Sequence, residues 1–348
     1  MNLQRTTDVK LWQVLLLPFS WLYGLGIILR NWCYDAGVFK ITKVNVPVIS
    51  VGNLTLGGTG KTPMVEYLIR YFQSRNKSVA VLSRGYKRSS EGTVIITSRQ
   101  KERGSAELLG DEPYQIARKF PNITVIVDEQ RPRGAKIAEQ EHSDVILLDD
   151  GFQHRALHRD VDIVMMGNGE RISSTPMLPA GMRREPLSSL RRASVLVFNG
   201  KTSTLKNNFY NKPQISISYH PVACRRFDGH SQSLEQLKGK TCVAFCGIAS
   251  PESFKTMLLQ QGVNVLDWNI FPDHHRYSQD DLDDAMKMFR EQKVDYILTT
   301  EKDTARLRNT PLKFPREMFY YLEIQVKIEE GEEMFHSLLQ QTMARSVV

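Results

Sequence analysis

Residues 48–62 read VISVGNLTLGGTGKT, an apolar strand-like run that enters a glycine-rich turn ending in Lys61 and Thr62. The residues that follow, PMVEYLIRYFQ, have the pattern of a helix. In a phosphate-binding loop, glycines let backbone N–H groups point at phosphate oxygens, the lysine supplies positive charge, and the hydroxyl ligates magnesium. The stretch therefore predicts a nucleoside triphosphate site between a strand and a helix.

The match to the strict loop pattern has one departure, because Thr55 stands where the pattern has glycine. The alternative interpretation is a glycine-rich turn with an incidental lysine. The correct flanking elements favour the nucleotide site. We expect the nucleotide to be bound by Thr55, Leu56, Gly57, Gly58, Thr59, Gly60, Lys61 and Thr62.

A second nucleotide signal lies at residues 144–154, DVILLDDGFQH, where an apolar run of strand length ends in Asp149 and Asp150. In P-loop proteins a carboxylate at the end of a neighbouring strand holds the magnesium that bridges the phosphates. The alternative is an acidic strand end that faces water. Gln153 and His154 follow in the turn, where they could face the same ligand.

Length and charge limit the class of protein. A chain of 348 residues can form two domains, and 41% hydrophobic residues suit a soluble or peripherally attached enzyme. The net charge of +8 favours an anionic partner such as a nucleotide or a phospholipid. A nucleic-acid binder is disfavoured because the arginines are not interleaved with aromatic residues. The four cysteines lack the pattern of a paired extracellular framework, so a reducing compartment fits better.

From Leu11 to Leu29 the chain carries no charged residue. A spanning helix needs about twenty apolar residues, and this stretch contains a proline, two glycines and polar side chains that weaken the match. We favour a helix that lies in or dips into the cytoplasmic face of a membrane, over a full span or a buried core helix. The membrane surface is thus a predicted partner.

Strand-like and helix-like runs alternate after this segment, which predicts an α/β fold with parallel strands. We expect a P-loop NTPase-like parallel sheet with helices on both faces, a smaller second α/β domain, and an N-terminal membrane-associated helix. The second domain should contain helices at Pro251–Gln261 and Gln279–Gln292. The expected divisions are the helix in 1–40, the nucleotide domain in 41–215, a linker in 216–232 that pairs with about 318–328, the smaller domain in 233–317, and a return strand and helix in 318–348.

Two further clusters are candidates for catalysis. Asp111 and Glu112 precede a proline and a predicted helix, so they either cap that helix or supply a general base. Asp273, His274 and His275 lie in a turn after a strand of the second domain. Zinc-ligand partners at the usual spacing are missing there, which favours a histidine that orients or polarises the base.

Arginines gather at the same predicted sheet edge. Arg183 and Arg184 follow a loop rich in proline and glycine and could grip a phosphate, with Glu185 near the metal. Arg84 and Arg131 follow two other predicted strands. The alternative for each of them is ordinary surface charge.

The stretches SVGNLTLGGTGKTP, SRGY, GDEP, DDGFQH, LPAGMRREP, FPDHH and TTEKD occur in this order behind an apolar N-terminal helix. Together they closely resemble the tetraacyldisaccharide 4'-kinase family of lipid A biosynthesis, from about residue 10 to residue 310. The resemblance implies a kinase that moves the γ-phosphate of ATP to the 4'-hydroxyl of an acylated glucosamine disaccharide 1-phosphate. It also implies that this kinase is peripheral or monotopic on the cytoplasmic face of the bacterial inner membrane, whose surface is then a partner. The implied activity requires neither an oligomer nor a nucleic acid.

The resemblance also implies residue roles. Asp111 would be the base, paired with His274, although His275 beside it leaves the choice of imidazole open. Lys61 and Thr62 would hold ATP and Mg²⁺. The metal region would comprise Thr62, Asp149, Asp150 and Glu185, and the substrate side Arg84, Arg131, Gln153, His154 and Arg184.

Two alternatives from other classes remain at this stage. One is a different membrane-associated P-loop ATPase or GTPase, although VFNGK at Val197 lacks the aspartate of a guanine-reading loop. The other is a nucleotide-switched binding protein in which Asp111 and His274 are structural. Acceptor-dependent release of ADP over many turnovers separates a kinase from both.

Overall fold

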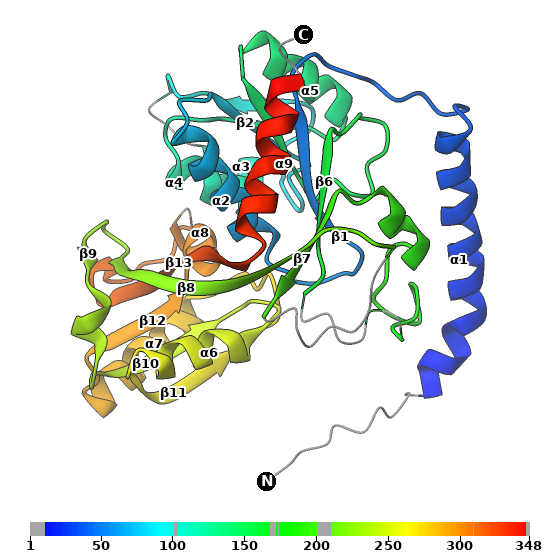
Figure 1. Cartoon of the computed structure of the whole chain (residues 1–348). Coiled ribbons are helices and arrows are strands. Elements are labelled where there is room, and N and C mark those ends of the chain that lie inside the picture. Colours follow the sequence, from blue (N-terminus) through cyan, green and yellow to red (C-terminus); the bar gives the residue numbers. More distant parts are fainter. Residues whose placement is uncertain are drawn as a thin grey trace.

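One mixed sheet runs through both lobes of the molecule (Figure 1). The computed structural model describes residues 11–100, 104–167, 172, 174–200, 210–308 and 310–345. Within them the strand order is β11-β10-β12-β13-β8-β7-β6-β1-β5-β2-β4-β3, and β9 pairs with β8. The expected α/β class with a mostly parallel sheet and an apolar N-terminal helix is confirmed.

The first lobe has a parallel sheet with an antiparallel edge strand, β3. Val48, Ala80 and Leu148 pack with α5 on one face, whereas Ile49 and Val51 pack with α2 on the other, as the twofold repeat of a strand requires. Its elements are β1 (Val48–Asn53), α2 (Lys61–Gln73), β2 (Val79–Ser83), β3 (Val94–Ile96), α3 (Ala106–Leu109), α4 (Asp111–Lys119), β4 (Thr124–Val127), α5 (Arg131–Gln140), β5 (Val145–Asp149), β6 (Val161–Met165) and β7 (Val195–Asn199).

Two long strands, β8 (Gln214–Arg226) and β13 (Phe319–Glu330), join the lobes. They pair antiparallel with each other, while β8 also pairs parallel with β7 and β13 with β12. The short strand β9 (Ser231–Gln232) extends this region. The two lobes are therefore held together by backbone hydrogen bonds.

The second lobe is a smaller parallel sheet of β10 (Thr241–Cys246), β11 (Asn264–Ile270) and β12 (Tyr296–Thr300), with α6 (Pro251–Gln260), α7 (Gln279–Gln292) and α8 (Glu301–Arg308). The helices α6 and α7 occur where the sequence predicts them, α6 ending one residue earlier. A capping box of Ser278 and Asp281 fixes the start of α7. Short 3-10 turns cover Leu187–Arg192, Leu234–Leu237 and Arg316–Met318.

The last helix, α9 (Glu332–Arg345), returns to the first lobe. Phe335 and Leu339 are fully buried in the core that contains α2. Tyr67 of α2 also bonds His336 over 2.7 Å. The C-terminal helix thus supports α2, the helix that follows the glycine-rich turn (Figure 1).

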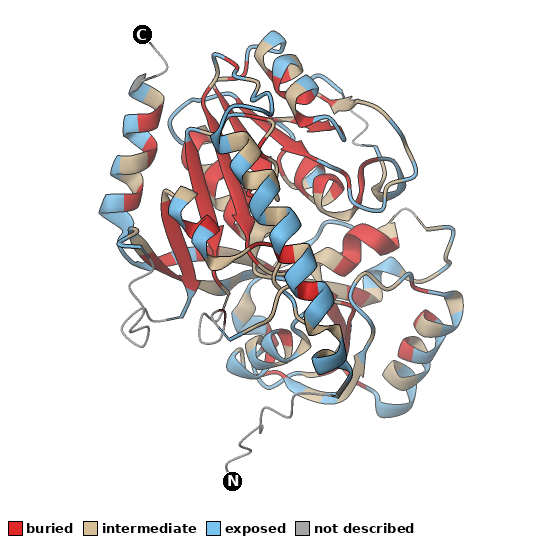
Figure 2. Cartoon of the chain, turned by 90° about the vertical axis from the view of Figure 1, so that its right-hand side faces the viewer, coloured by how far each residue is buried: buried red, intermediate tan, exposed pale blue. Residues whose placement is uncertain are grey.

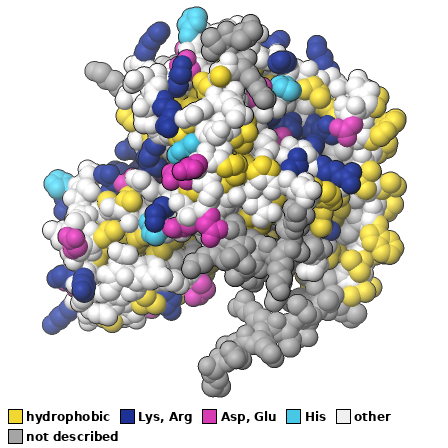
Figure 3. Space-filling view, in the orientation of Figure 1, with side chains coloured by type: hydrophobic (Ala, Val, Ile, Leu, Met, Phe, Trp, Pro, Cys, Tyr) yellow, Lys and Arg dark blue, Asp and Glu magenta, His cyan; other side chains and the backbone are white. Residues whose placement is uncertain are grey.

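The first helix, α1 (Leu11–Asp35), lies along the side of the first lobe and leaves most of its surface exposed (Figure 2). By length and composition, Trp12–Asp35 could cross a membrane, with mean hydropathy 1.6 and only 11% of its apolar window buried. Hydrophobic side chains gather along this edge (Figure 3). Because so little of α1 is covered, it is not a core helix of the described structure. Its exposed apolar residues include Trp12, Leu15, Phe19, Trp21, Leu22, Leu25, Ile28 and Leu29.

Candidate active site

The glycine-rich turn connects β1 to the first residue of α2, Lys61. Gly57 and Gly60 have φ angles of +107° and +82°, a region that glycine adopts without strain. A Cβ on Gly60 would also lie 1.6 Å from Tyr219 Oη of β8. Both the backbone conformation and the close approach of Tyr219 therefore require glycine at position 60.

Asn53, the last residue of β1, holds residues of the turn in place through side-chain hydrogen bonds. It is fully buried, and its Nδ2 donates to Thr59 Oγ1 over 2.9 Å. Its Oδ1 accepts from Lys61 Nζ at 3.4 Å and from the Arg184 guanidinium. Sequence reasoning missed this residue, because an asparagine at a strand end gives no distinct signal.

The paired carboxylates lie beside the turn because β5 pairs parallel with β1, which places Asp149 next to Val51. Asp150 Oδ1 is 3.5 Å from Lys61 Nζ, and both Asp150 oxygens accept hydrogen bonds from Arg184. Burial, followed by the charges of Asp150 and Glu112, raises the pKa of Asp149 to about 6. For Asp150, burial is outweighed by Arg184 and Lys61, and its pKa is well below the usual range.

These residues fit a magnesium–nucleotide complex. The described residues contain no group of three or more His, Cys, Asp or Glu side chains that could hold a metal alone. Mg²⁺ usually takes one or two carboxylates and completes its shell with phosphates and water. A buried carboxylate such as Asp149, whose charge is disfavoured by its surroundings, is stabilised by a cation. Thr62 is the second residue of α2.

Glu185 has a different environment from the one expected. It is fully buried, with Oε1 at 2.7 Å from Arg30 Nη2 of α1 and Oε2 at 2.5 Å from Arg192 Nη2. This differs from the expected metal role, because guanidinium groups already occupy both carboxylate oxygens. In the structure Glu185 fastens α1 to the first lobe.

The predicted substrate residues occupy three kinds of position. Arg84 is exposed, whereas Arg131 is buried and donates to the carbonyl oxygens of Asp149 and Asp150. The Arg184 guanidinium donates hydrogen bonds to Asp150 and Asn53. Arg131 and Arg184 thus support the carboxylate pair directly.

Within the part of the chain that the structure describes, Gln153 Oε1 and His154 Nε2 are buried and have no hydrogen-bond partner. Gln153 Nε2 is anchored on the Asn53 carbonyl at 2.7 Å. Burial, followed by the charges of Arg131 and other arginines, lowers the pKa of His154 to about 4. The imidazole is therefore neutral at neutral pH.

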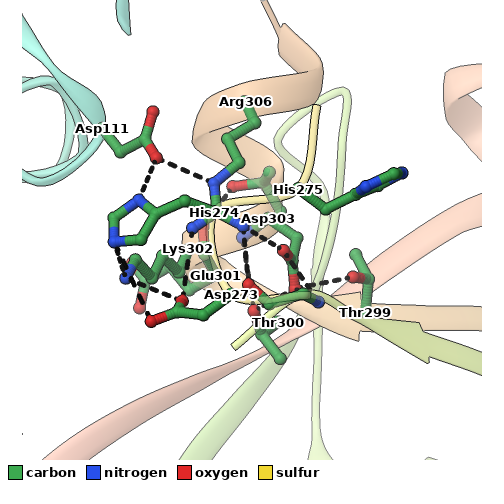
Figure 4. Close-up of polar contacts among 12 residues, drawn as sticks. Asp111, Asp273, His274, His275, Thr299, Thr300, Glu301, Lys302, Asp303 and Arg306 are labelled. Atoms are coloured by element: carbon green, nitrogen blue, oxygen red, sulfur yellow. Dashed lines mark hydrogen bonds and ion pairs between the residues drawn. The ribbon is translucent and has the colours of Figure 1, made fainter. Parts of the chain in front are cut away.

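Asp111 and His274 meet between the lobes (Figure 4). Asp111 begins α4 of the first lobe, and its Oδ2 is 3.0 Å from Nδ1 of His274 in the second lobe. His275 instead bonds Asp281 at 3.0 Å and stacks on Phe271. Of the two adjacent imidazoles, only that of His274 contacts Asp111.

Two cations of α8 complete this cluster, and sequence reasoning assigned a role to neither. Arg306 Nε donates to Asp111 Oδ2 over 2.8 Å, and Lys302 Nζ is 3.2 Å from His274 Nε2. Lys302 also pairs with Glu112 at 3.1 Å. Burial raises the pKa of Asp111, but hydrogen bonds from His274 and Arg306 outweigh it and leave a value of about 2.

Comparison with known proteins gives a consistent result. The family model described as tetraacyldisaccharide-1-P 4'-kinase matches residues 12–344. A tetraacyldisaccharide 4'-kinase of Porphyromonas gingivalis is 36% identical, covering 91% of this chain and 93% of its own length. One from Aquifex aeolicus is 38% identical, covering 92% and 96%. A crystal structure of LpxK from Aquifex aeolicus in complex with ATP superposes with a TM-score of 0.79 at 36% identity, over 96% of this chain and 100% of that one.

Proposed function

The chain belongs to the tetraacyldisaccharide 4'-kinase family, and from this premise we propose how its residues carry out the family's reaction. It is an ATP-dependent lipid A 4'-kinase, which transfers the γ-phosphate of ATP to the 4'-hydroxyl of an acylated glucosamine disaccharide 1-phosphate. The observation that carries the residue assignment is the contact of Asp111 with His274 across the two lobes.

Asp111 acts as the general base. Its Oδ2 is held by His274 and Arg306, and among the described residues no hydrogen bond reaches its Oδ1. Oδ1 can therefore accept the proton of the 4'-hydroxyl while the hydroxyl oxygen attacks the γ-phosphorus. The bond between the γ-phosphorus and the bridging oxygen breaks, ADP leaves, and the proton remains on Asp111 until solvent removes it.

The nucleotide lies on the turn of residues 55–62, with its phosphates at the start of α2. Lys61 neutralises phosphate charge, and its contacts with Asn53 and Asp150 hold it in place beforehand. Thr62, Asp149 and Asp150 would hold Mg²⁺, which when bound neutralises the charge that develops on the transferred group.

The acceptor approaches from the side of Gln153 and His154, whose polar atoms have no partner among the described residues and can bond sugar hydroxyls or the 1-phosphate. Arg84 supplies exposed positive charge. Arg131 and Arg184 act indirectly, because their guanidinium groups hold the backbone and carboxylates of Asp149 and Asp150.

The lipid is reached through α1, which we place on the cytoplasmic face of the inner membrane, where ATP is available. Its exposed apolar face would enter the interface, and the opposite face is fixed to the first lobe through Ser20, Tyr23 and Arg30. A helix anchored in this way keeps the nucleotide site at the surface from which the lipid is taken.

The test is turnover in detergent micelles, with ADP and phosphorylated lipid followed by mass spectrometry. With a tetraacylated disaccharide 1-phosphate we expect one phosphorylated lipid for each ADP. Asp111→Asn should lower kcat by about a hundredfold to ten-thousandfold and leave the KM for ATP unchanged. Asp284→Asn, at an exposed site on α7, is the control. ADP without phosphorylated lipid, or equal losses in kcat and ATP affinity, would refute the assignment.

A further inference from the structure

The stretch TTEKD, residues 299–303, joins the end of β12 to α8, and the reaction described above gives it no role. Two basic residues one turn apart on α8, Lys302 and Arg306, face the contact between Asp111 and His274 (Figure 4). Each touches a different member of that pair.

Lys302 defines the chemical form of His274. An ammonium group has only donors, so the contact of 3.2 Å requires His274 Nε2 to accept. The ring proton is then on Nδ1, which donates it to Asp111 Oδ2 at 3.0 Å. Glu112 and Asp273 lie at 3.8 and 3.9 Å from Nε2, and Lys302 pairs with both, which prevents them from drawing a proton onto that nitrogen.

Arg306 defines the orientation of Asp111. Only 6% of its side chain is exposed, and its Nη1 donates to Asp303 Oδ1 at 2.9 Å and to the Gly247 carbonyl at 2.8 Å. Its Nε is thereby directed at Asp111 Oδ2 over 2.8 Å.

Asp303 anchors that arginine. It is fully buried and accepts hydrogen bonds from the Gly247 backbone and from the hydroxyls of Thr299 and Thr300. The TTEKD stretch thus builds a rigid base for Arg306, since a side chain with several fixed partners has few alternative positions.

We propose that α8 is the positioning element of the catalytic pair: Lys302 selects the Nδ1–H tautomer of His274, and Arg306 turns the Asp111 carboxylate so that Oδ1 faces the acceptor hydroxyl. Neither cation needs to touch substrate. This inference rests on the proposed role of Asp111 as base, and its test must distinguish the two.

The first test is a double-mutant cycle on kcat. Lys302→Met should lower kcat by about ten- to a hundredfold with the KM for ATP unchanged, and Lys302→Arg should recover part of the loss because it retains a donor. In a His274→Gln background the same Lys302→Met change should cost less than about threefold, because its target is gone. Lys287→Met, at an exposed position on α7, is the control.

Arg306 is tested in the same way. Arg306→Gln should lower kcat in the wild-type background and have little further effect in Asp111→Ala. Because Arg306 also neutralises buried Asp303, thermal unfolding is measured alongside, and the Lys302 variants keep the proposal testable if Arg306→Gln does not fold.

The second test reads the tautomer directly. The measurement is NMR on protein labelled with ¹⁵N-histidine, in which the His274 signals are identified by their loss in His274→Gln. The wild type should show a protonated Nδ1 and an unprotonated Nε2 at His274. Lys302→Met should lose this signature, whereas Lys287→Met should keep it. Independent, multiplicative losses in the cycle, or an unchanged tautomer in Lys302→Met, would overturn the proposal. Full activity of Asp111→Ala and His274→Gln would instead refute the base assignment.

Discussion

Arg184 clasps Asp150 through two hydrogen bonds of 2.8 and 2.9 Å, and the same guanidinium also bonds Asn53. Two parallel bonds from a planar fork fix a carboxylate more tightly than a single ion pair. Lys61 shares both partners, with Asn53 at 3.4 Å and Asp150 at 3.5 Å. The position of Lys61, the lysine that we propose binds the nucleotide, therefore depends on Arg184.

Arg184→Ala should raise the KM for ATP by about tenfold, because the released Asp150 can turn towards Lys61 and divert its charge from the phosphates. Arg184→Lys should recover little, since an ammonium cannot form the two parallel bonds. Steady-state kinetics with varied ATP provide the measurement, and Arg191→Ala, at an exposed position, is the control. A change confined to the KM for lipid would show that Arg184 acts on the acceptor instead.

Gly60→Ala should destabilise the protein more than Gly57→Ala. Both sites have positive φ, which costs a residue other than glycine about 1–2 kcal/mol. At Gly60 the added methyl overlaps Tyr219, at a further cost of about 1–3 kcal/mol, whereas no atom of the described residues lies within 4 Å of a Cβ at Gly57. Thermal unfolding and ATP binding measure the difference. Tyr219→Ala in the Gly60→Ala background should restore part of the stability; no recovery would argue against the overlap.

His154 should make folding sensitive to acid. Its pKa is about 4 in the folded chain and near 6.5 when unfolded, so the unfolded chain binds the proton more readily. The stabilisation is complete above pH 6.5 and is lost as the pH falls from 6.5 to about 4, by at most roughly 3 kcal/mol. Urea unfolding across this range should show a smaller loss for His154→Gln. His230→Gln, where the side chain is 79% exposed, should behave like the wild type.

The outer face of α1 should control membrane binding. Leu22 and Leu25 are 68% and 63% exposed, and burying a leucine contributes roughly 1.5–3 kcal/mol. Leu22→Glu and Leu25→Glu should each lower the constant for partitioning onto anionic vesicles by about tenfold or more. Vesicle sedimentation measures this constant. Leu259→Glu, a 54% exposed leucine on α6, should leave binding unchanged. Equal effects at all three sites would indicate a general charge effect.

The parts of the site that the sequence predicts are those encoded locally. Two local patterns can be recognised within about fifteen residues each. One is a glycine-rich turn between a strand and a helix, and the other is a pair of carboxylates at a strand end. Parallel pairing of β1 with β5 then brings them together. The fold class follows from the same alternation of strand and helix patterns.

Contacts between distant segments are not visible in this way. Glu185 pairs with Arg30, which lies 155 positions away in the sequence. No local sequence pattern shows whether a carboxylate will pair with a distant arginine or bind a metal. Arg306 lies 195 positions from Asp111 and follows the TTEKD stretch without belonging to it. Asn53 reads as an ordinary strand end. Each role appears only in the folded chain, and that of Arg306 also requires the two lobes to be placed together.

The segment from Pro176 to Glu185 touches both α1 and the glycine-rich turn. On one side Ser20 bonds the Met177 carbonyl at 2.9 Å and Tyr23 the Arg184 carbonyl at 3.0 Å. On the other, the Arg184 amide donates to the Leu54 carbonyl and the Leu56 amide to the Met182 carbonyl, each at 2.7 Å. Removing α1 to obtain a detergent-free enzyme would therefore also remove support from the glycine-rich turn, where we propose that ATP binds. The proposed membrane helix and the proposed nucleotide site are thus mechanically connected.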